Sequence, residues 1–260
     1  MRPKITLMIV LATLLLAGVA LATVSPAGIE VTERVWNDCP TSMITTTVAS
    51  SSVNLVEQKQ FCGAGWGSRH NWRFSDGAVA QQFANADGFR VSCDLTFSGT
   101  GEGEGGLAIA PWWSSAVGGV FNLRTTDGEI ACFGGRLPFY SFTGSQGVTY
   151  TKGLTAHVTI AYLPNALAPH APATIEYSLE LEGSSYTSGA LPFDEGNPAE
   201  PYGVWGMLDD AQIGADMLHF LLDGDPDGYM EFDFANIMFE DLGTVANEDM
   251  TWGSMKALFR

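Results

Sequence analysis

Short β-rich segments separated by turn residues are the feature that most constrains how this chain folds. Beyond residue 23 there is little helical periodicity, and runs of alternating or β-branched apolar residues recur instead. These runs cover residues 89–97, 107–110, 119–124, 129–133, 154–162, 174–181, 202–207 and 229–239. Gly, Asp, Asn and Pro bound them, and Asp127-Gly128 is a typical hairpin turn. The pattern predicts an all-β fold, a two-sheet antiparallel β-sandwich.

Two segments depart from this strand pattern. Residues 209–222 carry apolar side chains at near-helical spacing and are the one stretch for which a helix is expected. The glycine-rich run 101–106 formally matches a dinucleotide-binding pattern. Its two Glu would repel a pyrophosphate, and Pro111 follows where a helix should begin. We therefore expect a flexible acidic loop tip between strands.

The N-terminus has the three parts of a secretory signal peptide. Arg2 and Lys4 precede an apolar run over residues 5–21, and Ala20-Leu21-Ala22 places small residues where a signal peptidase cleaves. Cleavage after Ala22 predicts a secreted or extracytoplasmic protein, in the periplasm or at the cell surface, with no transmembrane segment after cleavage. The alternative is an uncleaved membrane anchor, because the run is just long enough to span a bilayer.

Composition indicates one packed domain after the signal peptide. Of the 260 residues, 46% are hydrophobic, with 15 Phe, 7 Tyr and 7 Trp, which excludes a disordered chain. We expect the signal peptide over 1–22, a single β-sandwich domain over 23–242, and a linker with a C-terminal tail over 243–260.

The charge is strongly and unevenly negative. There are 29 Asp and Glu against 12 Lys and Arg, a formal net charge of −17, and no Lys or Arg occurs between Gly153 and Met255. Phosphate binding needs clustered Lys and Arg, so the charge excludes nucleic acid as a partner. The acidity of the second half favours cation binding or a salt-adapted surface.

The four cysteines predict two disulfides, because an even set in an exported protein meets an oxidising compartment. Cys93 and Cys132 each lie on the apolar face of an expected strand and so point inward. Among the three possible connectivities we therefore favour Cys93–Cys132 together with Cys39–Cys62. Zinc ligation is the alternative, but the sequence lacks a C-x-x-C motif or a nearby His.

Several segments together carry a family resemblance. They are Phe74-Ser75-Asp76-Gly77, the run 87–92, the hairpin 119–130 and the late strand 230–237. In this order they resemble the concanavalin A-like lectin/glucanase superfamily, which includes laminin G-like modules, in its secreted bacterial type. The resemblance covers roughly residues 70–242 and implies a jelly roll. It implies less about function, since this sandwich hosts lectins, hydrolases and adhesion modules.

A short acidic segment is a candidate calcium loop. Asp223, Asp225 and Asp227 alternate, and Glu231 follows, as in loops that wrap oxygen ligands around Ca²⁺. Phe234 stands where such a loop would close with a bidentate Glu. The segment therefore indicates a partial calcium site, and the alternative is an acidic surface turn between strands.

A carboxylate pair is the candidate for hydrolysis. Glu231 and Asp233 are two residues apart on an expected strand and share one face. Retaining glycosidases need two carboxyl groups only about 5–5.5 Å apart. Laminarinase-like glucanases, which the chain resembles, carry E-x-D-x-x-E, but Asn236 stands at the last position and cannot donate the catalytic proton. The same alternation is typical of an ordinary half-solvated strand.

Aromatic residues are the candidates for ligand contact. Trp112 and Trp113 are adjacent, so on an extended segment one of them is exposed and able to stack on a sugar ring. Tyr140 and Tyr202, with Tyr186 and Trp205 as further candidates, extend the possible platform. The alternative for each ring is a place in the hydrophobic core.

Histidines and serines give no enzyme signature. The four His show no tandem metal-binding spacing, and no G-x-S-x-G motif is present. His70, beside Arg69 and Asn71, is a candidate for a polar site, whereas His157 alternates with apolar neighbours and is expected at the surface or in packing.

The sequence as a whole favours a secreted, non-catalytic, lectin-like domain that binds carbohydrate or a cell surface, with possible calcium support. A non-enzyme is favoured over an enzyme. The alternatives are a glycoside hydrolase of the glucanase-like jelly-roll type and a structural or adhesion protein of the envelope without a small ligand. The expected partner is a glycan or a cell-surface molecule.

Overall fold

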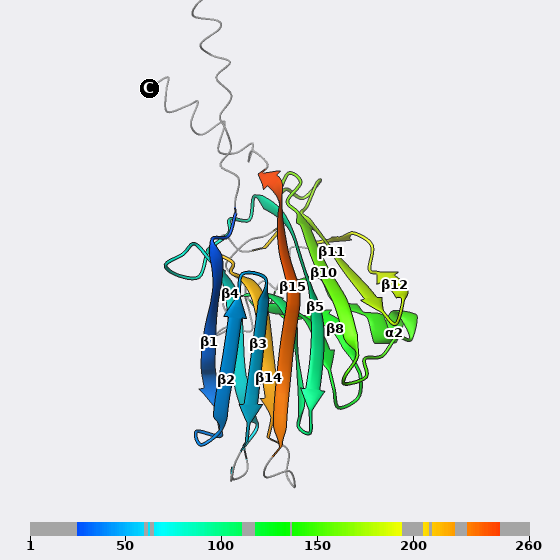
Figure 1. Cartoon of the computed structure of the whole chain (residues 1–260). Coiled ribbons are helices and arrows are strands. Elements are labelled where there is room, and N and C mark those ends of the chain that lie inside the picture. The colour runs from blue at the N-terminus through cyan, green and yellow to red at the C-terminus, as the bar shows by residue number, and fades with distance from the viewer. Residues whose placement is uncertain are drawn as a thin grey trace, which may run out of the picture.

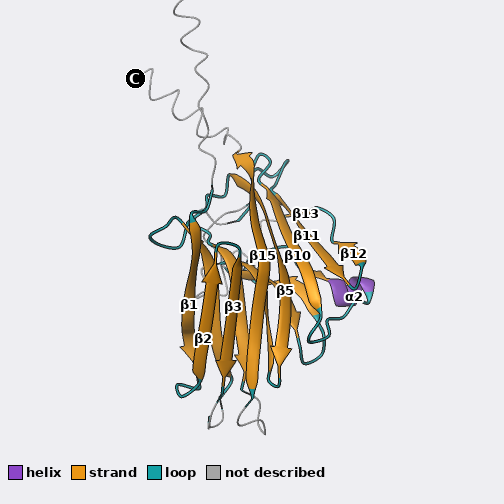
Figure 2. Ribbon diagram, viewed as in Figure 1, coloured by secondary structure: helices purple, strands orange, loops and turns teal. Residues whose placement is uncertain are grey.

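Two antiparallel sheets stacked face to face make up the computed structural model (Figure 1). The structure describes residues 25–59, 62, 65–110, 118–135, 137–193, 205–207, 210–221 and 228–244. Within this part of the chain the one helix is α2 (Phe142–Gln146), drawn in purple in Figure 2. The prediction of an all-β, two-sheet sandwich is confirmed.

The first sheet has seven strands in the order β1-β4-β14-β6-β7-β8-β9. Their bounds are β1 (Gly28–Asn37), β4 (Gly67–Ser75), β6 (Glu102–Ile109), β7 (Gly119–Arg124), β8 (Ile130–Phe133), β9 (Tyr140–Ser141) and β14 (Ile213–Phe220). The hairpin expected at Asp127-Gly128 joins β7 to β8.

The second sheet has eight strands, in the order β12-β11-β10-β5-β15-β3-β2 with β13 paired to β11. Their bounds are β2 (Met43–Ala49), β3 (Ser52–Gln58), β5 (Asp87–Gly99), β10 (Thr155–Leu163), β11 (Thr174–Leu181), β12 (Ser184–Thr187), β13 (Leu191–Pro192) and β15 (Tyr229–Thr244).

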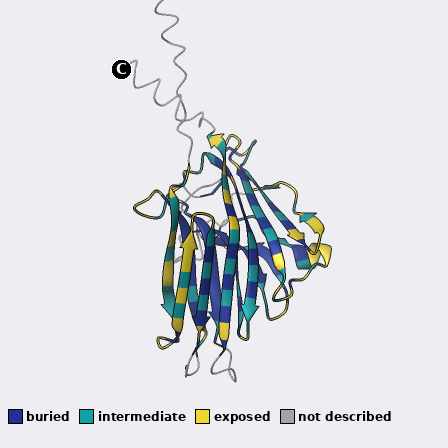
Figure 3. Ribbon diagram, viewed as in Figure 1, coloured by how far each residue is buried: buried dark blue, intermediate teal, exposed yellow. Residues whose placement is uncertain are grey.

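Alternation of apolar and polar residues places the core between the sheets. In β10 every second residue is fully buried, and the residues between them face outward (Figure 3). Rings from facing sheets meet in the core, as where Trp72 of β4 packs edge-on against Phe234 of β15 with ring centroids 5.8 Å apart. Polar side chains therefore lie on the outward faces of the two sheets.

The helix expected within 209–222 is a strand, and this prediction was wrong. β14 lies inside the seven-stranded sheet between β4 and β6, and Ile213–His219 are all buried. A strand buried on both faces loses the alternation that identifies strands in sequence, so its apolar residues also fit a helical spacing.

The acidic loop tip expected at 101–106 is the start of strand β6, a second correction. Its glycines allow close approach of neighbouring strands: a Cβ at Gly106 would lie 1.8 Å from the carbonyl oxygen of Phe121 in β7. Alternating Gly and Glu therefore serve strand packing here, although the same composition is typical of loops. In the run 202–207, residues 202–204 lie outside the described residues, and 205–207 form a bend rather than a strand.

Of the two disulfides predicted, Cys39–Cys62 is present, whereas Cys93 and Cys132 are free and buried. Cys93 lies in β5 and Cys132 in β8, in different sheets. A disulfide needs Cα atoms within about 7 Å, so two inward-pointing cysteines are not sufficient.

The ends of the chain remain predictions. Residues 1–22, expected as the signal peptide, and 245–260, expected as most of the tail, lie outside the described residues. Among the helices that the structure describes, none has the length and apolar character needed to cross a membrane.

Candidate functional site

A groove of about 270 Å³ lies on the outer face of the seven-stranded sheet, over the middle strands β14, β6 and β7. Its side walls carry aromatic, charged and amide side chains: Trp66, Arg69, Glu104, Asn122, Phe133 and Asp216. Glycines contribute main chain to the same lining: Gly105, Gly118, Gly119 and Gly134. The groove thus combines bare backbone with a few polar groups, a typical composition for a small-ligand site.

Trp66 is the exposed aromatic ring of this groove. The residue is 66% exposed, although one face of the ring stacks on Trp36 at a centroid distance of 5.2 Å and an interplanar angle of 14°. Its backbone N–H donates to Oδ2 of Asp38 at 2.7 Å, and its carbonyl accepts from the N–H of Leu221. The ring is therefore held in place on one face, and among the described residues Trp36 is its one aromatic stacking partner.

Two arginines, Arg69 and Arg73, bind the carboxylate of Asp216 at one wall of the groove. Arg69 donates to Oδ2 of Asp216 at 2.6 Å, and Arg73 donates to Oδ1 at 2.8 Å. The pKa of Asp216 would be raised by its burial, but the charges of Arg73 and Arg69 outweigh this effect and hold it below 3.8. Asp216 is therefore an ionised, doubly paired group and not a proton donor.

Glu104 and Asn122 form the opposite wall. Asn122 donates through Nδ2 to Oε2 of Glu104 at 3.0 Å, and the guanidinium of Arg124 lies 3.9 Å from the same oxygen. Arg124 also pairs with Asp127 and Glu129 at 2.6 Å each. The hydrogen bond from Arg124 to Asp127, with the neighbouring carboxylates, outweighs desolvation and raises the pKa of Arg124. Both walls thus consist of mutually paired charges.

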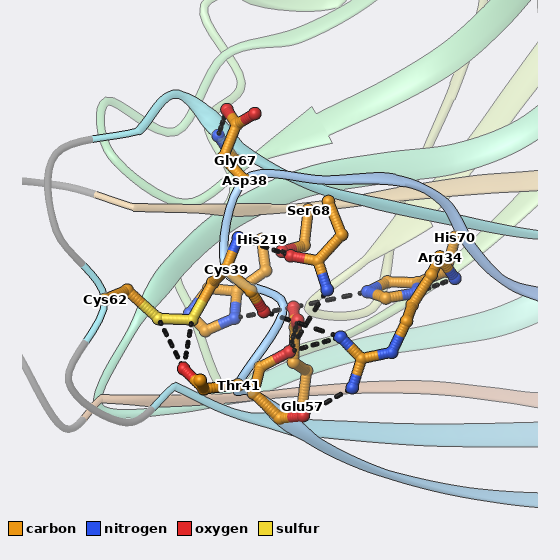
Figure 4. The surroundings of a disulfide bond; sticks show 12 residues. Arg34, Asp38, Cys39, Thr41, Glu57, Cys62, Gly67, Ser68, His70 and His219 are labelled. Atoms are coloured by element: carbon orange, nitrogen blue, oxygen red, sulfur yellow. Dashed lines mark hydrogen bonds and ion pairs between the residues drawn. A yellow bond between two sulfur atoms is a disulfide. The ribbon is translucent and has the colours of Figure 1, made fainter.

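A buried polar cluster lies next to the Cys39–Cys62 disulfide (Figure 4). Glu57 accepts from Ser42 Oγ at 2.6 Å, from His70 Nε2 at 3.2 Å and from His219 Nδ1 at 3.0 Å. The N–H of Arg34 donates to Nδ1 of His70 at 3.0 Å, so the ring proton of His70 lies on Nε2. His70, a candidate for a polar site from sequence, lies in this buried cluster and does not line the groove.

This cluster fixes the loop that carries Trp66. Burial raises the pKa of Glu57, but the hydrogen bonds from His219 and His70 outweigh it and bring the pKa well below its ordinary 4.5. The Arg34 guanidinium donates to the Cys39 carbonyl, and Cys39 adjoins Asp38, the anchor of the Trp66 backbone. The disulfide and the buried ion therefore hold the base of the groove wall.

The structure places few of the residues that sequence selected for ligand contact. Trp112, Trp113 and Tyr202 lie outside the described residues, as do Asp223, Asp225 and Asp227 of the expected calcium loop. Tyr140 is half-buried in the edge strand β9, where its ring packs edge-on against Phe142 and its hydroxyl accepts from Gln146. It does not line the groove.

The carboxylate pair lies on the opposite side of the sandwich. Glu231 and Asp233 both project from the outer face of the eight-stranded sheet, and Nδ2 of Asn54 donates to both, at 2.9 and 3.1 Å. Ser98 donates to the other oxygen of Glu231. Asn236 donates to Asp94 at 2.6 Å. Within the described ranges, no group of three or more His, Cys, Asp and Glu is arranged to hold a metal ion.

Sequence reasoning missed the residues that form the groove. Trp66 had a usable signal, since it lies between Gly65 and Gly67 in a loop four residues after Cys62, a place where a large ring has no strand face to bury it. Glu104 was assigned to a loop tip. Asp216 was assigned to a helix, which hid its position beside β4.

Comparisons with known proteins show similarity of fold. No family model matches the chain, and no curated protein matches it. A sialidase is 12% identical with a TM-score of 0.42, over 85% of this chain and 19% of the sialidase, so this chain spans about a fifth of that protein. A family 7 alginate lyase, A1-II', solved with its product, is 8% identical with a TM-score of 0.44, over 76% of this chain and 83% of the lyase.

A seed lectin of Lotus tetragonolobus is 7% identical with a TM-score of 0.42, over 85% of this chain and 96% of the lectin. The likeness is one of fold alone.

Proposed function

We propose that this protein is a secreted, lectin-like domain that binds glycan in the groove on the outer face of the seven-stranded sheet. The observation that carries the proposal is the position of Trp66, a residue that is 66% exposed at the groove and is held by Trp36 and Asp38. Sugar rings offer an apolar face that stacks on indole, and a ring fixed beside a groove is placed to make that contact.

The remaining lining suits sugar hydroxyl groups. Glu104 and Asn122 are oriented by their mutual hydrogen bond, so their other lone pairs and N–H groups are presented in fixed positions. Main chain of Gly105 and Gly119 lets a ligand approach the sheet closely. The volume, about 270 Å³, suits a small saccharide or the end of a longer chain.

Binding without hydrolysis is the favoured form of this proposal. Asp216 is enclosed by Arg69 and Arg73 and holds no proton to donate. The pair Glu231 and Asp233, which the glucanase resemblance selects, projects from the other sheet, away from the groove. Reducing-sugar release that depends on Glu231 would contradict this form.

Calcium support and export belong to the proposal as well. The alternating Asp223, Asp225 and Asp227 support a calcium loop, and the Cys39–Cys62 disulfide supports an oxidising compartment. Glu231 already accepts from Asn54 and Ser98, so the three aspartates would supply the side-chain ligands. Calcium should raise the melting temperature of the wild type but not of Asp225→Asn, as measured by differential scanning fluorimetry against EDTA.

A glycan array followed by calorimetry tests the binding claim. Trp66→Ala should raise the Kd for the best glycan by about tenfold or more, because an aromatic anchor at the centre of a site contributes at least about 1.4 kcal/mol. Phe139→Ala is the matched control, since Phe139 is 69% exposed and does not line the groove. Equal Kd values for wild type and Trp66→Ala would contradict the proposal.

A further inference from the structure

We infer that the groove selects uncharged glycans and excludes those that carry carboxylate or sulfate groups. The inference rests on the proposed glycan-binding function and concerns which glycans that same groove accepts. It follows from how the charged side chains of the lining are paired with one another.

The positive charge at the groove is already paired with a carboxylate. Arg69 is the cationic residue of the lining, and its guanidinium contacts Asp216 at 2.6 Å. Asp216 is the shared partner of Arg73 as well, at 2.8 Å, and both of its carboxylate oxygens are occupied. Two guanidinium groups against one carboxylate leave this wall with one net positive charge, and part of the hydrogen-bonding capacity of Arg69 is already used by Asp216.

The other wall adds negative potential. Glu104 lines the groove, and the nearby guanidinium of Arg124 is shared between Glu104, Asp127 and Glu129. One cation among three carboxylates leaves this wall with two net negative charges, so the two walls together carry a net charge of −1. The protein as a whole carries a formal charge of −17, so the long-range field also repels anions.

Uncharged hydroxyl groups meet no such barrier. A carboxylate accepts up to about four hydrogen bonds, so the bond from Asn122 leaves Glu104 able to accept from sugar hydroxyls. Stacking on Trp66 requires no charge on the sugar. The charged groups of the groove are paired with one another but can still accept hydrogen bonds from hydroxyl groups. They therefore favour ligands that are rich in hydroxyl groups and carry no charge.

Oligosaccharides that differ only at C6 test this inference. Neutral galactose and glucose oligomers are compared by calorimetry with the same oligomers oxidised at C6 to uronates. The uncharged members should bind about tenfold more tightly or better, corresponding to about 1.4 kcal/mol. In Asp216→Asn, which uncovers Arg69 and Arg73, this preference should fall at least threefold. Glu104→Gln provides a second variant if Asp216→Asn fails to fold.

Asp233→Asn is the charge-matched control, because it removes the same charge from the opposite sheet and should leave the preference unchanged. Tighter or equal binding of the uronates by the wild type would overturn the inference while leaving glycan binding intact. An equal change of preference in the control would also overturn it, by assigning the effect to total charge. Absence of binding to every oligosaccharide would overturn the proposed function and this inference together.

Discussion

The carboxylate of Glu57 is charged and has no exposure to solvent. Burying a charge in the protein interior costs free energy unless hydrogen-bond partners compensate for the lost water. Three hydrogen-bond donors compensate for this cost: the hydroxyl of Ser42 and one ring nitrogen each of His70 and His219. Because two of the donors come from strands β4 and β14 and one from the segment before β2, the carboxylate ties both sheets together. Its removal leaves these donors without their acceptor.

Glu57→Gln should lower the free energy of unfolding at pH 7 by about 2–4 kcal/mol, because the new amide cannot accept from every donor. Urea denaturation followed by circular dichroism measures this change. Glu180→Gln is the control, since Glu180 is exposed on β11 and its loss should change stability by less than about 0.5 kcal/mol. A loss in Glu57→Gln no greater than in the control would contradict the account.

The same variant should alter the response to acid. The pKa of Glu57 is lower in the folded protein than its ordinary 4.5, so its contribution to stability is fully present above pH 4.5 and declines as the pH falls below that value. Wild-type stability should therefore decrease more steeply between about pH 5 and 2 than that of Glu57→Gln. Parallel stability curves over this range would contradict the assignment.

At the residue scale, sequence reveals a polar residue but not its partners. His70 was selected because polar Arg69 and Asn71 flank it, and it does lie in a polar cluster. Nothing local links it to Glu57 or to His219, which is 149 positions away in the printed sequence. The groove also depends on residues far apart in the sequence, such as Arg69 and Asp216, and no local sequence motif could have predicted it.

Strand β6 shows how closely the middle of the seven-stranded sheet is packed. Gly106→Ala should be strongly destabilising, because the added Cβ would lie 1.8 Å from the Phe121 carbonyl oxygen and force β6 away from β7. A loss of about 3 kcal/mol would lower the melting temperature by about 6–12 °C. Gly28→Ala is the control, since no atom lies within 4 Å of its added Cβ. Equal melting temperatures for both variants would contradict this packing.

Because Cys93 in β5 and Cys132 in β8 are not bonded to each other, we expect two free thiols in the folded protein. Cys93 and Cys132 are buried, and desolvation raises the pKa of both, so neither should react with a thiol reagent in the folded protein. Unfolding in guanidinium without reductant should release two thiols per chain, while Cys39 and Cys62 remain bonded. Detection of no thiol after unfolding would mean that the second disulfide forms after all.

Strands with one solvated face could be found from sequence, and strands buried on both faces could not. β10 and β11 alternate clearly and were located to within a residue. β14 is buried along nearly its whole length, and β4 carries polar residues that are buried through pairing, so neither shows a period of two. These are the strands beside the groove, which is why the fold was easier to predict than the site.

The whole molecule has two polar outer faces with different chemistry. One carries the groove, with Trp66 and paired charges around Asp216. The other carries Glu231 and Asp233, bridged by the amide of Asn54. The family resemblance directed attention to the second face, because its E-x-D pattern is local in sequence, whereas the groove exists only after the sheet has formed.

The most direct test is to map a bound uncharged oligosaccharide by NMR on ¹⁵N-labelled protein. Asn122 and Asn54 provide side-chain amide signals in matched positions, one at the groove and one at the carboxylate pair. Binding should shift the signals of the Asn122 amide and the Trp66 indole N–H while the Asn54 amide stays in place. Shifts centred on Asn54, with Asn122 and Trp66 unchanged, would contradict the assignment of the site.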